Sequence, residues 1–478
     1  MVNFTEEDIV RWEYNCLDCI YTKEIKDAIY PLVFERSEKF QEFYNFQQND
    51  VLPALVQIMN RGIRIDLEKK KQLLDELSKL LKHIEEQVNL ILGMEINLKS
   101  SVQIKTLFKD FLNVKPLIDK KRKTESFGSE AMFHYLETYP EYHPIISLIL
   151  EYRSIGIFVR TFLSAEVDDD NRMRTSYNAA GTKSYRLSSR KNAFGKGMNL
   201  ANIPSKGKID LKYALIDLKE ETEDNDTIVD REIVSGTYEG YTKLPNCKEL
   251  FLPDEGYTFF NCDYSGADAM VVAWDSDCAW LQNFFTTSKE KLYIYIVREY
   301  LQKEITTSDP FYKKAKQFVH LTNYGGMEEK AAASSGLDIL TAKSLRQWYF
   351  SKCPEIPEWH KRIASQVKNK GYIENIFGAR FWLLDKTCPT LLNQAYSLIP
   401  QSTIAILCNK GLVNITKKET NIQVLMQIHD ALAGQFISTD LEAPERIIKH
   451  MSIPLPYKNP LTIPVDISTS TISYGHCN

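Results

Sequence analysis

The sequence lacks an apolar run long enough to cross a membrane, and its first ten residues are acidic and polar. These absences argue against a transmembrane protein and against a secretory signal peptide. Internal repeats are missing as well. We therefore expect a soluble protein with no membrane partner.

Zinc-binding cysteine patterns are also missing. Of the nine cysteines, Cys16 and Cys19 form a single C-x-x-C, and no second pair or histidine pair follows at zinc-finger spacing. Scattered free thiols are typical of a reducing compartment, which favours the cytoplasm.

The chain is long and mixed in composition. Its 478 residues are too many for one compact core, so two to four packed units are expected. Apolar residues make up 44% and charged residues 26%, which is typical of a soluble globular protein.

The formal net charge of −4 is unevenly distributed. Residues 217–232 hold eight carboxylates against Lys219 and Arg231, so the remainder of the chain is slightly basic. Basic clusters at 120–123, 183–196 and 313–316 could follow a phosphate backbone, although each alone is also explained as solvated surface.

Two carboxylates occupy unusual positions. Asp263 ends an apolar segment, 257–263, that is predicted as a strand, and Asp430 lies in the turn of a predicted hairpin over 422–437. Burying a carboxylate costs several kcal/mol unless it is compensated. Two Mg²⁺ ions would compensate both groups and would suit in-line phosphoryl transfer. From spacing alone the metal site is a weak signal, because a solvated turn aspartate also explains each residue.

A cationic and aromatic stripe marks one helix. Asp309 and Pro310 predict a helix start. In the helix that follows, four residues at spacings of three or four positions share one face: Lys313, Lys316, His320 and Tyr324. Such a face could bind a nucleoside triphosphate, with lysine on the phosphates and a ring on the base. The alternative is an exposed basic surface.

These pieces belong to a series of seven motif-like segments in a recognisable order. In chain order they are TKSYRLSS (182–189), NLANIP (199–204), DYSGAD (263–268), KQFVHLTNYG (316–325), GYIENIFGAR (371–380), IPQST (399–403) and QIHD (427–430). In family A DNA polymerases the corresponding motifs read T-x-T-G-R-L-S-S, NLQNIP, DYSQIE, K-x3-[FY]-x3-YG, GYVETLFGRR, P-I-Q-G-T and QVHDE. The chain resembles that family from about residue 9 to about residue 467.

The resemblance implies roles for particular residues. The metal ligands would be Asp263, Asp430 and the main-chain carbonyl of Tyr264, holding two Mg²⁺ ions, for which Mn²⁺ could substitute. The implied nucleotide-binding residues are Lys316, His320, Tyr324, Asp268, Lys313 and Tyr293. The implied DNA-binding residues are Arg186, Gln401, His429, Asn199, Asn202, Lys121 and Arg122.

Several positions depart from the family pattern. Asp268 replaces a glutamate that closes the space of a ribose 2′-hydroxyl, so weaker rejection of ribonucleotides is expected. His320 replaces Phe or Tyr, and Tyr293 replaces a histidine that contacts phosphate. Ala431 replaces the glutamate that ends the QVHDE motif, and we expect activity to survive the loss of this carboxylate.

The resemblance implies an α+β right-hand fold, in which an antiparallel palm sheet carries the two aspartates and the fingers and thumb are helical. The expected divisions are an exonuclease-domain tail (1–30), a palm entry helix region (31–61), a thumb (62–165), a first palm segment with an acidic insertion at 205–246 (166–279), fingers (280–370) and a second palm segment (371–478).

The start of the chain resembles only the end of a 3′–5′ exonuclease domain. Tyr14 and Asp18 match its last motif, Y-x3-D, and the other acidic ligands of such a site are missing. We therefore expect no proofreading activity of its own, and Asp18 is then a carboxylate on a helix surface.

The expected function is template-directed DNA synthesis in a bacterial or phage-infected cytoplasm, with primer–template DNA and dNTPs as substrates. A separate exonuclease, a clamp or a helicase are candidate partners. A single-subunit RNA polymerase is one rival, opposed by the acidic residue at 268 and by the segment 182–189. A catalytically silent DNA-binding scaffold is another, opposed by the presence together of Asp263, Asp430 and Lys316.

Overall fold

The computed structural model describes residues 5–35, 37–119, 123–204, 207–208, 214–215, 236–237, 243–385, 388 and 390–477. The chain forms two compact units. The first comprises residues 1–60, 177–188 and 260–468, and the second comprises 61–176, 189–259 and 469–478. Within the described residues, no helix has the length and apolar character to span a membrane.

An antiparallel sheet forms the base of the first unit. Its strand order is β15-β16-β12-β17, with bounds Ile422–Ile428, Ala431–Ile437, Tyr257–Tyr264 and Val465–Ser470. Ile428 pairs with Ala431, so His429 and Asp430 form a two-residue turn, in which His429 has a φ of 56°. The strand 257–263 and the hairpin 422–437 were both predicted from their apolar patterns, and both are confirmed.

The first unit also contains helices, some of which pack on this sheet and some of which form the first part of the chain. The long helix α15 (Leu391–Lys418) contacts β15, α8 (Ala267–Asp275) and α16 (Ala443–Met451), and most of its residues are buried. The first helices of the chain are α1 (Glu6–Phe34), α2 (Glu38–Phe46) and α3 (Leu52–Arg61), with a π-helical turn between the last two. A buried helix of this length gives the sheet a rigid backing.

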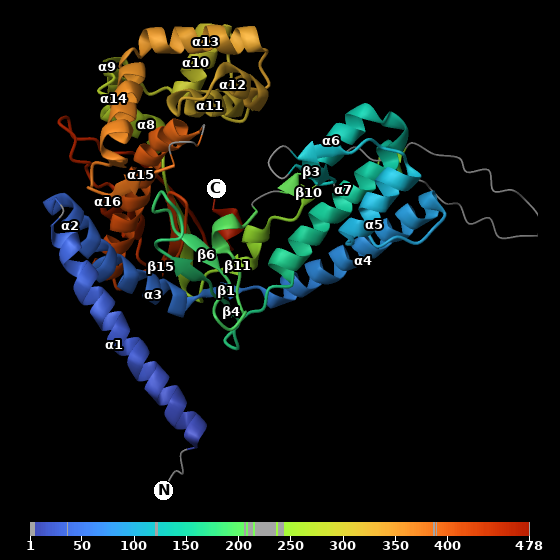
Figure 1. The fold of residues 1–478 in the computed structure, drawn as a ribbon, viewed down its shortest axis with the longest axis horizontal. Coiled ribbons are helices and arrows are strands. Elements are labelled where there is room, and N and C mark those ends of the chain that lie inside the picture. Colours follow the sequence, from blue (N-terminus) through green and yellow to red (C-terminus); the bar gives the residue numbers. More distant parts are fainter. Residues whose placement is uncertain are drawn as a thin grey trace, which may run out of the picture. The chain divides into compact units, whose positions relative to one another are not determined.

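Along the chain, a cluster of helices follows β12 and precedes β15 (Figure 1). Its members are α9 (Ala279–Thr287), α10 (Leu292–Leu301), α11 (Pro310–Asn323), α12 (Glu328–Ser335), α13 (Ile339–Lys352) and α14 (Glu355–Lys370), followed by the hairpin β13 (Tyr372–Glu374) and β14 (Arg380–Trp382). As predicted, α11 begins at Asp309, whose carboxylate accepts a hydrogen bond from the Phe311 amide at 2.8 Å. The pair Gly325 and Gly326 predicts the end of this helix, and α11 ends at Asn323, just before them.

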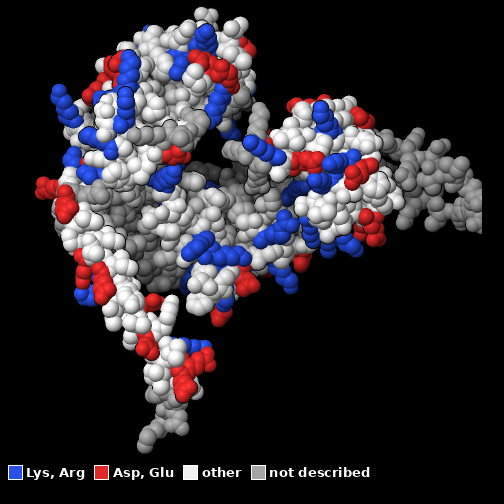
Figure 2. Space-filling model, viewed as in Figure 1, with Lys and Arg blue, Asp and Glu red and all other residues white. Residues whose placement is uncertain are grey.

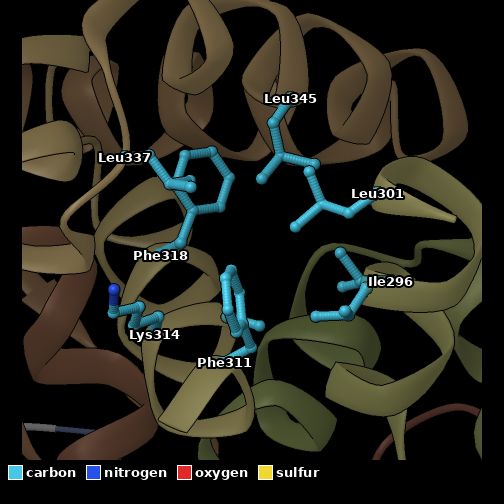
Figure 3. Close-up of a pocket in the computed structure, with 9 residues that line it drawn as sticks. Ile296, Leu301, Phe311, Lys314, Phe318, Leu337 and Leu345 are labelled. Atoms are coloured by element: carbon cyan, nitrogen blue, oxygen red, sulfur yellow. The ribbon is translucent and has the colours of Figure 1, made fainter. Parts of the chain in front are cut away.

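The core of this cluster contains a small apolar pocket between α10, α11 and α13. Figure 3 shows apolar side chains converging on it, while Lys314 lies at its edge with the ammonium group pointing away. The labelled apolar residues are Ile296, Leu301, Phe311, Phe318, Leu337 and Leu345. We interpret the pocket as internal packing that keeps α10 and α11 in a fixed relation.

The second unit combines a small sheet with helices. The strands β11 (Phe251–Leu252), β1 (Ile63–Ile65) and β4 (Arg172–Met173) form one sheet. The helices are α4 (Leu67–Leu92), α5 (Ser101–Thr106), α6 (Ser129–Thr138) and α7 (His143–Phe158). The sequence predicts a helix start at Asp66, and helix α4 begins there, because the Asp66 carboxylate accepts a hydrogen bond from the Lys69 amide at 2.9 Å.

The basic and polar sequence of residues 120–128 predicts a loop, and for the later residues of this segment that prediction is wrong. Strand β3 (Thr124–Ser126) pairs with β2 (Leu117–Asp119) in a hairpin. Short-range pairing therefore extends into a polar stretch with no apolar alternation. Residues 120–122, and most of the acidic segment 205–246, lie outside the described residues. The described part of the acidic segment is 207–208, 214–215, 236–237 and 243–246, and it contains the strands β7 (Gly207–Lys208), β8 (Ala214–Leu215), β9 (Gly236–Thr237) and β10 (Lys243–Leu244).

Helix α7 buries a carboxyl group in the apolar interior of the second unit. Glu151 is 4% exposed, and its Oε1 has no hydrogen-bond partner among the described residues. Burial raises the pKa of Glu151 from 4.5 to about 7. The protonated form is therefore favoured in the folded chain.

We predict that Glu151→Gln removes a pH dependence of stability. The folded pKa lies above the unfolded one, so the wild-type chain is stabilised by protonation below pH 4.5 and loses that stability as the pH rises to 7. The loss is about 3 kcal/mol in all, at ~1.4 kcal/mol per pKa unit. Denaturant unfolding of both chains at pH 5 and pH 8 measures it, and parallel pH curves for the two chains would contradict the prediction.

Candidate active site

The structure brings Asp263 and Asp430 into electrostatic contact. Asp263 lies near the end of β12, and Asp430 lies in the turn that leads into the neighbouring strand β16. Burial raises the pKa of Asp263 to about 6, and the charge of Asp430 contributes to that rise, against the opposing effect of Lys316. Three residues from separate motifs therefore share one electrostatic environment.

This environment suits a divalent cation. The Asp263 Oδ1 atom is buried and has no hydrogen-bond partner among the described residues. A buried, unpaired carboxylate oxygen beside a second carboxylate is a costly arrangement that a bound cation would relieve. Across the residues that the structure describes, however, no three His, Cys, Asp or Glu side chains form a group that could hold a metal by themselves.

A buried tyrosine holds the strand that leads to the Asp430 turn. The Tyr177 hydroxyl accepts a hydrogen bond from the Gln427 amide at 3.1 Å and donates to the Gln427 carbonyl at 3.3 Å. The Gln427 side-chain amide donates to Asn409 Oδ1 at 2.9 Å. On the other strand, the Tyr264 hydroxyl donates to the Met451 carbonyl at 2.7 Å. Sequence reasoning missed Tyr177 and Asn409, because neither belongs to a recognisable motif.

Helix α11 presents its predicted stripe toward the same environment. Lys313 and Lys316 are exposed, whereas His320 is half-buried. Just after the helix, the Tyr324 hydroxyl donates a 2.6 Å hydrogen bond to Asp268 Oδ1. The Asp268 side chain, one methylene shorter than glutamate, is therefore held against Tyr324.

Tyr293 does not have the exposure expected of a phosphate ligand. It is 5% exposed, and its hydroxyl lies 3.3 Å from His320 Nε2. Burial lowers the pKa of His320, and the nearby charge of Asp268 partly opposes that effect. Tyr293 is thus buried next to His320 and is not exposed at the surface.

Three residues expected to bind DNA near the primer end lie in the same unit as Asp263 and Asp430. Arg186 lies close enough for its charge to lower the pKa of both His320 and Tyr324, so it belongs to the same environment. Gln401 is half-buried on α15, and His429 is exposed beside Asp430. The stripe on α11 and these donors therefore occur within one compact unit.

The remaining candidates lie elsewhere. Asn199, in the second unit, accepts hydrogen bonds through its Oδ1 from the Ser189 hydroxyl at 2.6 Å and from the Ala201 amide at 3.1 Å. That oxygen thus stabilises the local turn. Asn202 is exposed, and Lys121 and Arg122 lie outside the described residues.

Comparison with known proteins gives a consistent family assignment. The sequence model of DNA polymerase family A matches residues 67–473. The thermostable DNA polymerase I of Thermus filiformis is 22% identical over 458 residues, which is 93% of this chain and 49% of that protein. DNA polymerase I of Bacillus caldotenax is 25% identical over 411 residues, 82% of this chain and 40% of that protein. The chain thus spans about half the length of the curated relatives it matches.

The fold also matches a solved structure. This is the POL domain of Pol1 from M. smegmatis, described in complex with DNA primer-template and dNTP. The match has a TM-score of 0.70 at 21% sequence identity and covers 91% of this chain and 71% of that one. The mixed α and β architecture expected from the sequence is thereby confirmed.

Proposed function

The chain belongs to DNA polymerase family A, and from this we propose that it adds dNTPs to the 3′-end of a primer under the direction of a template strand. The observation that carries the proposal is the convergence of Asp263, Asp430 and Lys316 on one environment. Two carboxylates and a cation at the end of a sheet are the groups that nucleotidyl transfer from a triphosphate requires.

In the proposed reaction, different protein groups bind the metal ions, the triphosphate and the bases. Asp263, Asp430 and the Tyr264 carbonyl would hold two Mg²⁺ ions, with Mn²⁺ as a substitute. Bound there, the ions lower the pKa of the attacking 3′-hydroxyl and neutralise the triphosphate and the leaving pyrophosphate. Lys316 and Lys313, exposed on α11, bind phosphate oxygens. His320 stacks on the incoming base and Tyr324 occupies the template-base position.

Duplex binding would rely on a few polar donors and on a basic surface. Arg186, Gln401 and His429 are proposed to meet the minor groove near the primer end, where N3 and O2 acceptors recur in every correct pair. Figure 2 shows stretches of Lys and Arg on the second unit, over α4 and α7, although the formal net charge of the chain is −4. Local charge rather than net charge decides contact with phosphates.

We further propose that the chain does not proofread by itself. Asp18, which with Tyr14 resembles the last motif of a 3′–5′ exonuclease domain, is exposed on α1. Proofreading would then require a separate exonuclease, and a clamp or helicase could assist synthesis. Degradation of a 3′-labelled single strand by the purified chain would contradict this proposal.

The decisive experiment is primer extension with the purified chain, a primed DNA template, four dNTPs and Mg²⁺. Products that follow the template sequence support the proposal. Unprimed synthesis from ribonucleotides would instead indicate an RNA polymerase. Binding of primer–template without any extension would indicate a silent scaffold.

We predict that Asp268→Glu increases discrimination against ribonucleotides. The longer side chain would extend into the space that a 2′-hydroxyl needs, whereas Asp268 is drawn to the Tyr324 hydroxyl. We expect a gain of roughly tenfold in the ratio of kcat/KM for dNTP to that for rNTP, which corresponds to about 1.4 kcal/mol. An unchanged ratio, with extension of dNTPs preserved, would show that this position does not set sugar selectivity.

A further inference from the structure

Two neighbouring helices, α10 and α11, are joined by a hydrogen bond between rings. Tyr293 lies at the start of α10, His320 lies in the last turn of α11, and the phenol oxygen is 3.3 Å from His320 Nε2. Their ring centroids are 6.1 Å apart at an interplanar angle of 43°. The rings are tilted rather than stacked, so the hydrogen bond is the specific contact between them.

Tyr293 is poorly placed to touch a substrate itself. It is 5% exposed, and its ring packs edge-on against Tyr312 of α11, with centroids 5.5 Å apart and an interplanar angle of 80°. Burial raises the pKa of its hydroxyl, so the group stays a phenol that can donate a proton. Two side chains of α11 therefore hold the ring in place, and its hydroxyl is directed at one of them.

His320 is the side chain on which this hydroxyl acts. Burial lowers its pKa and favours its neutral form, and the charged groups that act on it are Asp268, Lys316, Arg186 and Asp430. A neutral imidazole has one protonated nitrogen, and a donor at Nε2 leaves the proton on Nδ1. No hydrogen bond to Nδ1 occurs among the described residues.

We propose that Tyr293 is a positioning residue, whose hydroxyl fixes the ring orientation and tautomer of His320 so that Nδ1–H is available to an oxygen of the incoming nucleotide. The proposal rests on the proposed function and deepens it. The recognised group is a sugar hydroxyl or phosphate oxygen, because an N–H donor requires an acceptor. Tyr293 then acts on the nucleotide only through His320.

A double-mutant cycle with single-nucleotide addition tests this role. The variants are Tyr293→Phe, His320→Phe and the double variant, and kcat and KM for the dNTP are measured on a primed template. We expect Tyr293→Phe to raise KM about five- to tenfold with kcat within about twofold, as loss of one hydrogen bond predicts. In the His320→Phe background the same change should alter KM by less than about twofold.

Tyr312→Phe is the matched control, since it removes a phenol oxygen from the same ring cluster without touching His320. Its KM should equal that of the wild type. Equal KM effects of Tyr293→Phe in both backgrounds would overturn the proposal in favour of a direct substrate contact. A lowered melting temperature with unchanged KM would overturn it in favour of a packing role. If the wild-type chain extended no primer, the proposed function itself would be refuted. The outcomes of the double-mutant cycle test only the role of Tyr293.

Discussion

Replacing Asp430 by asparagine is expected to lower the rate of primer extension by about 10³-fold or more while leaving primer–template binding intact. The substitution keeps the size of the side chain and removes the charge that acts on Asp263. Loss of one metal-binding carboxylate removes several kcal/mol of charge stabilisation, and about 4 kcal/mol corresponds to a thousandfold. Single-turnover extension rates, with DNA affinity measured in parallel by fluorescence anisotropy, provide the test.

Asp466→Asn is the matched control for that experiment. Asp466 is an exposed carboxylate on β17, beside β12, and its charge also raises the pKa of Asp263. It is not a proposed metal ligand, so its removal should change the rate by less than about threefold, as expected for an exposed charge. If Asp430→Asn retained more than a tenth of the wild-type rate, or if both variants behaved alike, the assigned role of Asp430 would be wrong.

Replacing Lys316 by alanine is expected to reduce kcat/KM for dNTPs by about 10- to 100-fold. Lys316 is exposed on α11, and its charge lowers the pKa of Asp263, so the ammonium group lies near the carboxylates. A charge-assisted hydrogen bond to a phosphate is worth about 1.5–3 kcal/mol, which sets the expected range.

The measurement is steady-state addition of a single nucleotide over a range of dNTP concentrations. Lys330→Ala, which removes an exposed lysine of α12 from the same helical cluster, serves as the control and should leave kcat/KM unchanged. An equal loss in both variants would mean that the effect comes from overall charge. A loss confined to DNA affinity would place Lys316 on the duplex instead of the triphosphate.

Much of the candidate site could be predicted because its local signals are strong. Apolar segments identified β12, β15 and β16, and the two caps Asp66 and Asp309 begin helices where expected. The two-residue turn at His429 and Asp430 also follows from local pattern. Each of these signals acts over a few residues, so the sequence contains it in full.

Other features had no local signal. Tyr177 supports the end of β15 from a segment far away in the sequence, and the hydroxyl of Tyr293 lies 3.3 Å from His320 Nε2 of another helix. Strand β3 was taken for part of a loop because it is short and polar. Burial and partner choice at such positions depend on which distant segments pack together, and a single sequence does not display that.

By itself the sequence determined which chemical groups this protein carries, which of them end strands or share a helix face, and the family that their order resembles. Only the tertiary structure decided that the Oδ1 atom of Asp263 is buried, that Asp430 and Lys316 act on this carboxylate, and that Asp268 and His320 each have a tyrosine partner. The physical reason is one of range. Caps and side-chain alternation operate between neighbours along the chain, whereas desolvation and Coulomb interactions depend on distances that only folding sets.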